Sequence, residues 1–405
     1  MDLLVLVVFI AVYAGMILGE IPGLALDRSG IALLGAIAIL ASGRLTIEDA
    51  WLAVDVHTLA LLFGLMVISA QFRLGGFYTE TVRRIAARGA DPERLLLSVI
   101  VAAGALSALL ANDIVCLAMA PMLIEVCSRR RLNPVPFLLA LACASNVGSA
   151  ATLIGNPQNM FIGESLKLSF AGYLIDGAPP AALGLGATWL IIRAQWRDRW
   201  AVAEPVRVDR RQPPRFDRWQ TGKGITLLTI TVAAFLFTSW PRDVVALAAA
   251  GVLLLSRRMA SRDMIGLVDW HLLVLFVGLF VVNDAVERQG LLKTMYVALA
   301  SAGVDLARPG WLFAVTPVLS NLISNVPAVM LLLPAATGPH AGAILALTST
   351  FAGNLLIVGS IANIIVVEEA GRQGVGIDWR AHARTGIPVT LVTLAIAGAW
   401  LWMRW

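Results

Sequence analysis

Residues 106–121 read LSALLANDIVCLAMAP, and residues 319–334 read LSNLISNVPAVMLLLP. The two stretches align without a gap, so that Asn112 matches Asn325 and Pro121 matches Pro334. Each consists of two apolar runs that meet at a polar tip, and each run of about 15 residues is too short to cross a bilayer alone. Polar backbone at membrane depth is tolerated only where protein buries it or where it lines a cavity. The stretches therefore predict two re-entrant helical hairpins, over residues 95–128 and 309–338.

The sequence around the hairpins is also repeated. VDVHTLALLFGLMVI, which starts at Val54, matches VDWHLLVLFVGLFVV, which starts at Val268, with Asp, His and Gly in register. After the hairpins, residues 144–164 (ASNVGSAATLIGNPQNMFIGE) align with residues 348–369 (TSTFAGNLLIVGSIANIIVVEE), and Glu164 matches Glu368. The glycine and proline of GNPQN disfavour a continuous helix, and the second copy keeps the glycine. Each half is therefore predicted to contain one broken transmembrane helix.

Composition places most of the chain in a bilayer. Of 405 residues, 59% are hydrophobic and 14% are charged, and the mean hydropathy is +0.81, outside the range of soluble domains. The net charge of +5 does not indicate a nucleic-acid partner, because the basic residues are spread over short loops. We expect an all-α polytopic protein with helices at about 2–19, 29–43, 55–72, 136–154, 171–193, 224–240, 243–256, 270–286, 341–357 and 385–403.

The distribution of basic residues predicts the orientation. If the loops at 28, 73–94, 129–131, 193–223, 257–263 and 372–384 are cytoplasmic, they hold 24 of the 31 Lys and Arg. Both termini then lie outside the cytoplasm, in a multi-pass protein of the cell inner (plasma) membrane. The first apolar run, Leu3 to Leu18, has no basic region before it, so it is expected to be a retained helix and not a signal peptide. Corresponding segments of the two halves have opposite orientations, which makes the repeats inverted.

The chain divides at a polar linker. We predict a first membrane half over 1–193, with repeat 1 at about 49–193, and a cytoplasmic Arg/Pro-rich linker over 194–223. The second membrane half covers 224–405, with repeat 2 at about 263–403. Inverted repeats with broken helices are typical of carriers that work by alternating access.

Polar residues inside the apolar segments gather at the two hairpin tips and the two helix breaks. Unwound backbone frees carbonyls that coordinate a cation, and helix N-termini favour an oxyanion; polar side chains in membrane helices also act as interhelical contacts and caps. The predicted substrate- and ion-binding residues are Asn112, Asp113, Ser145, Asn146, Ser149, Thr152, Gly155, Asn156, Asn159, Ser320, Asn321, Ser324, Asn325, Thr350, Asn354, Gly359, Ser360 and Asn363. No metal is expected apart from sodium at the hairpin tips.

Asp113 is the one acid predicted deep in the membrane, and Val326 takes its place in the second hairpin. A buried carboxyl can exchange a proton for a cation or for substrate, which makes Asp113 the candidate for proton coupling. Its alternative role is to cap the second helix of its hairpin.

His57 and His271 are expected to be interfacial anchors. Cys116 and Cys143 are expected to pack, with contact to a thiophilic metalloid as the alternative.

The ANDIVCLAMAP hairpin, its SNVPAVMLLLP mate, the GSAATLIGNPQN break and the RTGIPVTL segment resemble the arsenite-permease and anion-permease branch of the ion transporter (citrate-transporter-like) superfamily. The resemblance covers essentially the whole chain. It implies a substrate held between the two tips and the two broken helices, and a homodimer. Carboxylate carriers of the superfamily carry Ser-Asn-Thr at each tip, whereas this chain has Ala111, Asn112 and Asp113 at the first and Ser324, Asn325 and Val326 at the second.

Three transport functions follow. The leading one is efflux of arsenite or antimonite, a small oxyanion or metalloid, coupled to protons through Asp113; no Lys or Arg is expected in the membrane interior to balance a multivalent carboxylate. Sodium-coupled uptake of di- or tricarboxylates or other anions is the second, and sodium/proton antiport is the third. No cofactor is expected beyond H⁺ or Na⁺ as coupling ion. An enzyme is not expected, because Asp113 has no second membrane acid and no nucleophile with a histidine near it in sequence.

Overall fold

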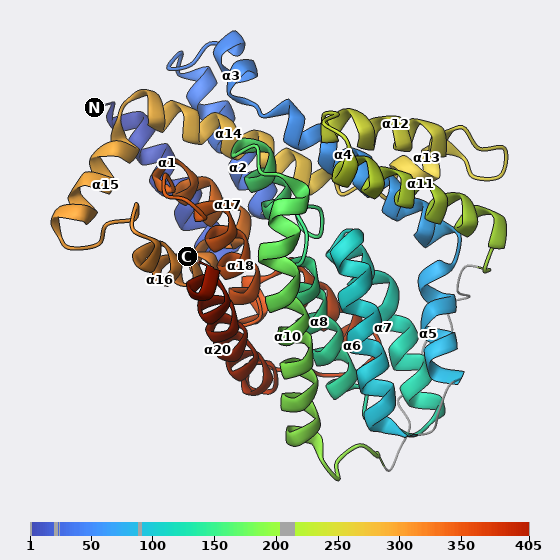
Figure 1. Ribbon diagram of the computed structural model, residues 1–405. Helices are drawn as coiled ribbons and strands as arrows, with labels where there is room; N and C mark the ends of the chain where they lie inside the picture. The colour runs from blue at the N-terminus through green and yellow to red at the C-terminus, as the bar shows by residue number, and fades with distance from the viewer. Residues whose placement is uncertain (1, 20–22, 24, 88–90, 203–214, 405) are drawn as a thin grey trace.

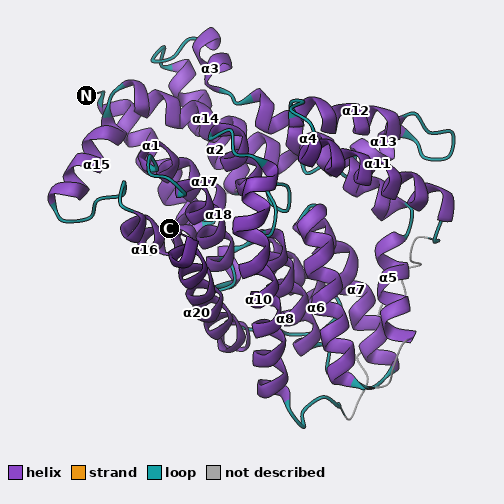
Figure 2. Cartoon of the chain, viewed as in Figure 1, coloured by secondary structure: helices purple, strands orange, loops and turns teal. Residues whose placement is uncertain are grey.

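The computed structural model describes residues 2–19, 23, 25–87, 91–202 and 215–404, and these residues form twenty α-helices, two short 3-10 helices and no strand (Figures 1 and 2). Arg88 and residues 203–214 of the predicted linker, with Arg207, Arg210 and Arg211, lie outside the described residues. The expectation of an all-α polytopic fold is confirmed.

Helices α1 to α10 recur in the same order as α11 to α20. The first set is α1 (Leu3–Leu18), α2 (Arg28–Ala41), α3 (Ile47–Ala53), α4 (Val56–Leu74), α5 (Phe77–Ala87), α6 (Pro92–Leu109), α7 (Asn112–Arg129), α8 (Val135–Ser149), α9 (Pro157–Ser165) and α10 (Phe170–Trp196). The second set is α11 (Arg218–Phe237), α12 (Arg242–Leu254), α13 (Ser261–Ile265), α14 (Trp270–Arg288), α15 (Leu291–Ser301), α16 (Pro309–Ile323), α17 (Asn325–Leu332), α18 (Ala341–Ala352), α19 (Ile361–Arg372) and α20 (Trp379–Arg404), with 3-10 turns η1 (Leu333–Ala335) and η2 (Ile357–Gly359). The repeat of helices begins at α1 and α11, whereas the repeats predicted from the sequence begin only at about residues 49 and 263.

Within the described ranges of the chain, six helices are long and apolar enough to cross a membrane: α4, α6, α10, α11, α14 and α20. Helix α6 is the first arm of hairpin 1 and has 18 residues, more than the 15 expected, but the chain reverses at Leu110 and Ala111 and returns as α7. The second hairpin is formed by α16 and the shorter α17.

The predicted extent of the two broken helices was wrong at their inner ends. Helix α8 ends at Ser149 instead of 154, and α18 ends at Ala352 instead of 357. The chain stops being helical early because buried side chains replace the helical hydrogen bonds there. The breaks themselves, including the one without a proline, are confirmed.

Helices α1, α2, α4, α11, α12 and α14 form a unit that we call the frame, in which α4 packs on α12 and α14 packs on α2. A Cβ atom on Gly64 would lie 2.7 Å from the backbone of Ala246, and one on Gly278 would lie 2.6 Å from the backbone of Ala32. These glycines are the repeated Gly of the aligned sequences, and both crossings join one repeat to the other. The repeated acids have a local role, since Asp269 caps α14 by accepting a hydrogen bond from Leu272 N (3.0 Å).

Helices α6–α10 and α16–α20 form a second unit, the hairpin core. Helix α6 packs on α8, α16 on α18 and α10 on α20, and Figure 1 shows the two hairpins on either side of α10 and α20. A Cβ atom on Gly177 would lie 2.7 Å from the carbonyl oxygen of Ala150, and one on Gly386 would lie 2.1 Å from that of Asn354. Glycine therefore lets α10 and α20 approach the backbone of the two breaks.

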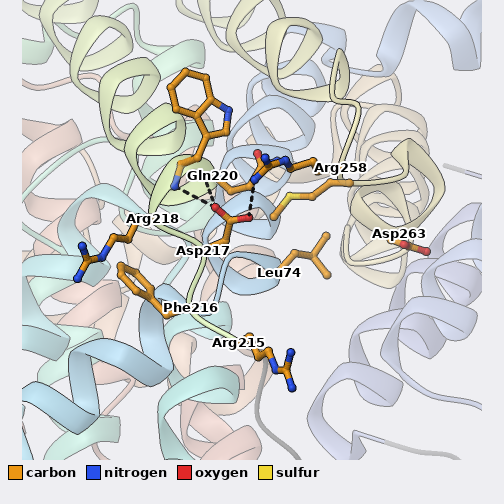
Figure 3. A pocket seen from close by; sticks show the side chains of 10 residues that line it. Leu74, Arg215, Phe216, Asp217, Arg218, Gln220, Arg258 and Asp263 are labelled. Atoms are coloured by element: carbon orange, nitrogen blue, oxygen red, sulfur yellow. Dashed lines mark hydrogen bonds and ion pairs between the residues drawn. The ribbon is translucent and has the colours of Figure 1, made fainter.

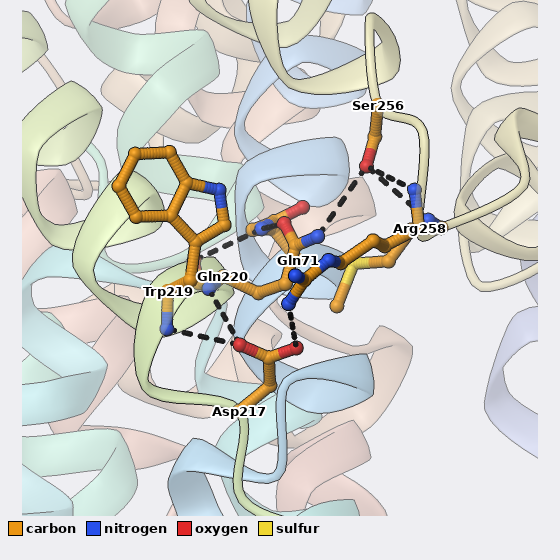
Figure 4. A network of polar contacts seen from close by, with 7 residues as sticks. Gln71, Asp217, Trp219, Gln220, Ser256 and Arg258 are labelled. Atoms are coloured by element: carbon orange, nitrogen blue, oxygen red, sulfur yellow. Dashed lines mark hydrogen bonds and ion pairs between the residues drawn. The ribbon is translucent and has the colours of Figure 1, made fainter.

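The loops that hold most of the basic residues meet on one side of the molecule, the arginine-rich face. Arg193 pairs with Glu93 (2.6 Å), Arg258 pairs with Asp217 (3.8 Å), and the Arg130 guanidinium donates to the Ala86 carbonyl. In Figure 4, Gln71 of α4 donates to the side chain of Gln220 (2.9 Å), and Asp217 caps α11 by accepting from Trp219 N (2.9 Å) and Gln220 N (3.0 Å). These contacts tie the ends of α4, α11 and α12 together at that face.

Candidate functional site

The two hairpin tips and the two helix breaks lie together inside the hairpin core. The backbone N–H of Asn112, at the first tip, donates to the Gly155 carbonyl in the first break (3.4 Å). At the second tip, the amide nitrogen of Asn325 donates to the carbonyls of Ser349 (3.1 Å) and Gly359 (3.2 Å). Each tip is thus bonded to the break of its own repeat.

One asparagine in each break holds the unwound backbone in the same way. Asn159 Nδ2 donates to the carbonyls of Thr152 (3.0 Å) and Ser149 (3.5 Å). Asn363 Nδ2 donates to the carbonyls of Leu356 (3.1 Å) and Gly353 (2.7 Å). Both amides reach the residues seven and ten positions earlier, so the repeat extends to individual hydrogen bonds, and both satisfy carbonyls that a continuous helix would have satisfied.

Asn146 of α8 joins the first repeat to the second. Its Nδ2 donates to Asn354 Oδ1 (2.9 Å) and Asn363 Oδ1 (3.1 Å), and its Oδ1 accepts from Ser360 Oγ (2.8 Å) and Asn112 Nδ2 (3.5 Å). All five side chains are buried. Asn146 therefore bonds the first tip and the second break at once.

Thr350 occupies the equivalent place on α18. Its hydroxyl donates to Asn159 Oδ1 (3.3 Å) and accepts from Asn156 Nδ2 (3.2 Å) and Gln158 Nε2 (3.2 Å). The oxygen of Asn325 accepts from the other hydrogen of the Gln158 amide (3.3 Å). The second broken helix is thereby bonded to the first break, as Asn146 bonds the first broken helix to the second. We call the side chains around Asn146 and Thr350 the amide network.

The remaining predicted residues support the tips and breaks. Ser145 Oγ donates to the Asn112 carbonyl (3.2 Å), Ser149 Oγ accepts from Asn156 Nδ2 (2.9 Å), and Thr152 Oγ1 donates to the Ala108 carbonyl. On the other side, Ser320 Oγ donates to the Ser349 carbonyl (3.3 Å), and Asn321 Nδ2 donates to the Ala352 carbonyl (2.9 Å).

Ser324 forms the second tip with φ 76° and ψ 161°, a conformation that is essentially restricted to glycine and that costs roughly 1–3 kcal/mol for other residues. The corresponding Ala111 has φ −55° and ψ 117° and is unstrained. The two tips thus have the same place in the fold but different backbone conformations.

The amide network is neutral and has two unpaired polar atoms. Its side chains are amides and hydroxyls, and Asn112 Oδ1 and Asn354 Nδ2 are buried without a hydrogen-bond partner in the described residues. Helices α7, α9, α17 and α19 begin at the tips and breaks, so four N-terminal ends point toward the network. Helix N-termini and unpaired amide atoms are groups that favour the oxygen atoms of a small solute.

Asp113 lies at the first tip but faces a different space. It lines a cavity of about 230 Å³ together with Asp269, Arg73, Met160 and Ile365. The cavity lies between the hairpin core and the frame, next to the loop before α14. Arg73, which the sequence alone had assigned to a loop, belongs to the last turn of α4 and lines this cavity.

The structure adds residues that sequence reasoning left out. Gln158 bonds Thr350, and the Tyr173 hydroxyl donates to the Ala150 carbonyl (2.8 Å) and accepts from Asn159 (3.3 Å). Gln158 stands inside the GNPQN motif, which was a usable signal; a tyrosine in an apolar helix gives none. Asp269 was noticed only as the repeated acid of the VDWH motif, and Arg73 was assigned to a loop, so the sequence placed neither of them at the cavity.

Three other features lie outside the network. His57 Nδ1 lies 2.7 Å from Asp243 Oδ2 and His271 Nδ1 lies 3.7 Å from Asp27 Oδ2, so both histidines pair at helix starts within the frame. Cys116 and Cys143 are fully buried. A cavity of about 650 Å³ at the arginine-rich face, drawn in Figure 3, is lined by residues such as Arg215, Asp217 and Arg258 and includes none of the predicted site residues.

Comparisons with known proteins agree with this architecture. The chain is 30% identical over 431 residues to the uncharacterized transporter Rv2685 of Mycobacterium tuberculosis, covering 100% of this chain and 99% of that protein. It is 28% identical over 458 residues to the silicon efflux transporter LSI3 of Oryza sativa subsp. japonica, with 93% of each covered. The crystal structure of the Alcanivorax borkumensis YdaH transporter, described as having an unusual topology, matches with a TM-score of 0.63 at 16% identity, over 100% of this chain and 98% of that one.

The structural match supports the fold alone, whereas the sequence match defines the relationship. The family described as citrate transporter matches residues 4–352, which is most of the chain and includes the first repeat, the frame and the second hairpin. The chain is therefore a membrane protein that belongs to the citrate transporter family.

Proposed function

We propose that this chain is a secondary active transporter that exports arsenite, antimonite or a similar small metalloid hydroxide across the cell inner membrane in exchange for protons. In this proposal the arginine-rich face is cytoplasmic, and substrate binds by alternating access at the amide network. Asp113 is the proton-coupling residue.

The observation that carries the proposal is the neutral amide network with its two unpaired atoms. Near neutral pH arsenite is mostly the uncharged hydroxide, which offers hydroxyl groups that both donate and accept hydrogen bonds. Asn112 Oδ1 supplies a free acceptor and Asn354 Nδ2 a free donor. A solute with these groups pairs both atoms, and unpaired buried amides cost free energy when the site is empty. The rice relative is described as a silicon efflux transporter, and silicic acid is likewise an uncharged hydroxide near neutral pH.

Asp113 is suited to coupling because it faces the cavity instead of the network. A carboxyl beside Asp269 and Arg73 in a space of about 230 Å³ can gain or lose a proton without breaking a hydrogen bond of the substrate site. Proton binding and substrate binding would then communicate through the tip, where Asp113 follows Asn112.

A second function is favoured by one observation. Arg73 supplies a positive charge on the same cavity, and the family description names citrate, so sodium-coupled transport of di- or tricarboxylates is the alternative. Sodium/proton exchange without a further solute is the third, and it would use Asp113 and Asp269 as the exchanging carboxylates.

The test uses everted membrane vesicles with labelled arsenite, silicic acid, citrate and succinate under imposed proton or sodium gradients. We expect proton-driven accumulation of arsenite by the wild type, a loss of at least tenfold in Asp113→Asn, and no change in Asp263→Asn, an exposed acid of α13. Sodium-driven citrate or succinate flux, or sodium/proton exchange with no solute moved, would overturn the proposal. Transport of silicic acid without arsenite would keep the class of substrate and correct its identity.

A further inference from the structure

The inverted repeat places the same charged residues at both faces of the molecule. Arg28 begins α2 and Arg242 begins α12, while Glu164 near the end of α9 corresponds to Glu368 near the end of α19. In each set the arginine belongs to the frame and the glutamate belongs to the hairpin core. The first set (Arg242 with Glu164) lies at the face opposite to the arginine-rich face, and the second set (Arg28 with Glu368) lies at the arginine-rich face.

The set at the opposite face is assembled. Arg242 Nε lies 2.8 Å from Glu164 Oε1, and Arg242 also donates to the Gly163 carbonyl (2.8 Å). The two side chains are only 13% and 15% exposed, so the ion pair is largely removed from solvent. It joins the last turn of α9 to the first turn of α12 and thereby binds the hairpin core to the frame.

The set at the arginine-rich face is not assembled. The Glu368 side chain is 59% exposed and pairs with Arg372 of its own helix (3.8 Å). Arg28 makes no ion pair with the described residues, and its Nε is buried without a hydrogen-bond partner. An unpaired buried guanidinium nitrogen destabilises this arrangement relative to one in which it is paired.

The side chains beside the Arg242–Glu164 set are closely packed, whereas those beside the Arg28–Glu368 set line a cavity. Phe161 of α9 packs on Phe276 (6.3 Å between ring centroids) and Phe280 (5.5 Å) of α14, which closes the space beside it. Its repeat mate, Ile365 of α19, lines the cavity of about 230 Å³ together with Leu267. The hairpin core is therefore in contact with the frame at the opposite face and separated from it at the arginine-rich face.

We propose that Glu164–Arg242 and Glu368–Arg28 are alternating gates, of which one is closed whenever the other is open. The structure shows the state with the first gate closed. In the other state α19 moves toward α2, Glu368 pairs with Arg28, and Glu164 separates from Arg242. Because the switch between the states replaces one arginine–glutamate pair by its repeat equivalent, a bias toward either pair shifts the populations of the two states. The inference rests on the alternating access of the proposed function but not on its substrate or coupling ion.

The test is chemical cross-linking in membranes, without substrate, after the three buried native cysteines are replaced by alanine. The pairs are Glu164→Cys with Arg242→Cys and Arg28→Cys with Glu368→Cys. His57→Cys with Asp243→Cys is the control, because both positions belong to the frame and stay together in both states. A bifunctional thiol reagent is needed, since direct disulfides require Cα atoms closer than about 7 Å. We expect all three pairs to cross-link.

The decisive measurement adds Arg242→Ala, which opens the first gate, to the Arg28→Cys and Glu368→Cys pair. The cross-linking yield of this pair should rise about fivefold, the ratio given by a bias of about 1 kcal/mol, while the control yield stays constant. No cross-link at 28 and 368 with or without Arg242→Ala, while the other two pairs react, would overturn the gates. Since no solute is used, the cross-linking result can contradict the gates while the vesicle assay still supports arsenite transport. It can equally support the gates while the vesicle assay contradicts arsenite transport.

Discussion

At the residue scale, the site depends on which hydroxyls and amides reach across the repeats. Thr348 and Thr350 are both buried on α18, but their hydroxyls differ in partners. Thr348 Oγ1 donates to the Ile344 carbonyl of its own helix (2.6 Å), whereas Thr350 Oγ1 bonds Asn156, Gln158 and Asn159 of the other repeat. Two threonines that are two residues apart on the same helix thus have unequal roles.

This difference predicts unequal effects of the same substitution. Thr350→Val leaves the buried amides of Asn156 and Gln158 short of an acceptor, so we expect it to lower the free energy of unfolding by about 1–3 kcal/mol. Thr348→Val removes only a hydrogen bond to its own helix and should be close to neutral. Thermal unfolding of both purified variants in detergent measures the effect, and equal midpoints would contradict a linking role for Thr350.

At the element scale, the frame depends on two close helix crossings. Gly64 meets the backbone of Ala246, and Gly278 meets that of Ala32. Since small residues let membrane helices approach closely, these two positions determine the distance between α4 and α12 and between α14 and α2.

Added methyl groups at the two crossings should therefore destabilise the protein. Gly64→Ala and Gly278→Ala each force the helix backbones apart, and we expect each to cost about 1–3 kcal/mol. Gly251→Ala on α12 is the control, because a Cβ there meets nothing within 4 Å, and it should be neutral or stabilising by up to about 1 kcal/mol. Unfolding midpoints that fall equally in all three variants would show that the crossings are not tight.

At the scale of the whole molecule, the two halves are interlocked. The frame pairs α4 with α12 and α2 with α14, and the amide network bonds Asn146 to Asn363 and Thr350 to Asn159. When one half is absent, the glycine faces and the buried amides of the other half lose the residues that they contact.

Neither half should therefore be stable alone. We expect fragments 1–202 and 215–405, expressed separately, to be degraded or protease-sensitive in membranes, and to become resistant when expressed together. Limited proteolysis followed by co-purification through a tag on one fragment measures this. A single fragment that resists protease as well as the co-expressed pair would show that each repeat folds independently.

The sequence by itself determined the repeat, the hairpins and the breaks. Long apolar runs, a polar tip repeated 213 residues later and paired Gly and Asn residues are local or periodic signals, and they predicted the positions of Asn112, Asn146, Asn159 and Asn363 in one region. The inner ends of α8 and α18 were predicted too late, because amides distant in sequence replace their last helical hydrogen bonds.

Only the tertiary structure decided how these residues face one another. Asp113 follows Asn112 directly, yet its side chain lines the cavity with Arg73 and Asp269 while Asn112 bonds Asn146. Two copies of the same sequence pattern also do not reveal that Arg242 pairs with Glu164 while Arg28 makes no equivalent ion pair with the described residues. An internal repeat specifies equivalent residues, but the relative position of the hairpin core and the frame decides which of the equivalent contacts forms, because a contact depends on distance and not on sequence register.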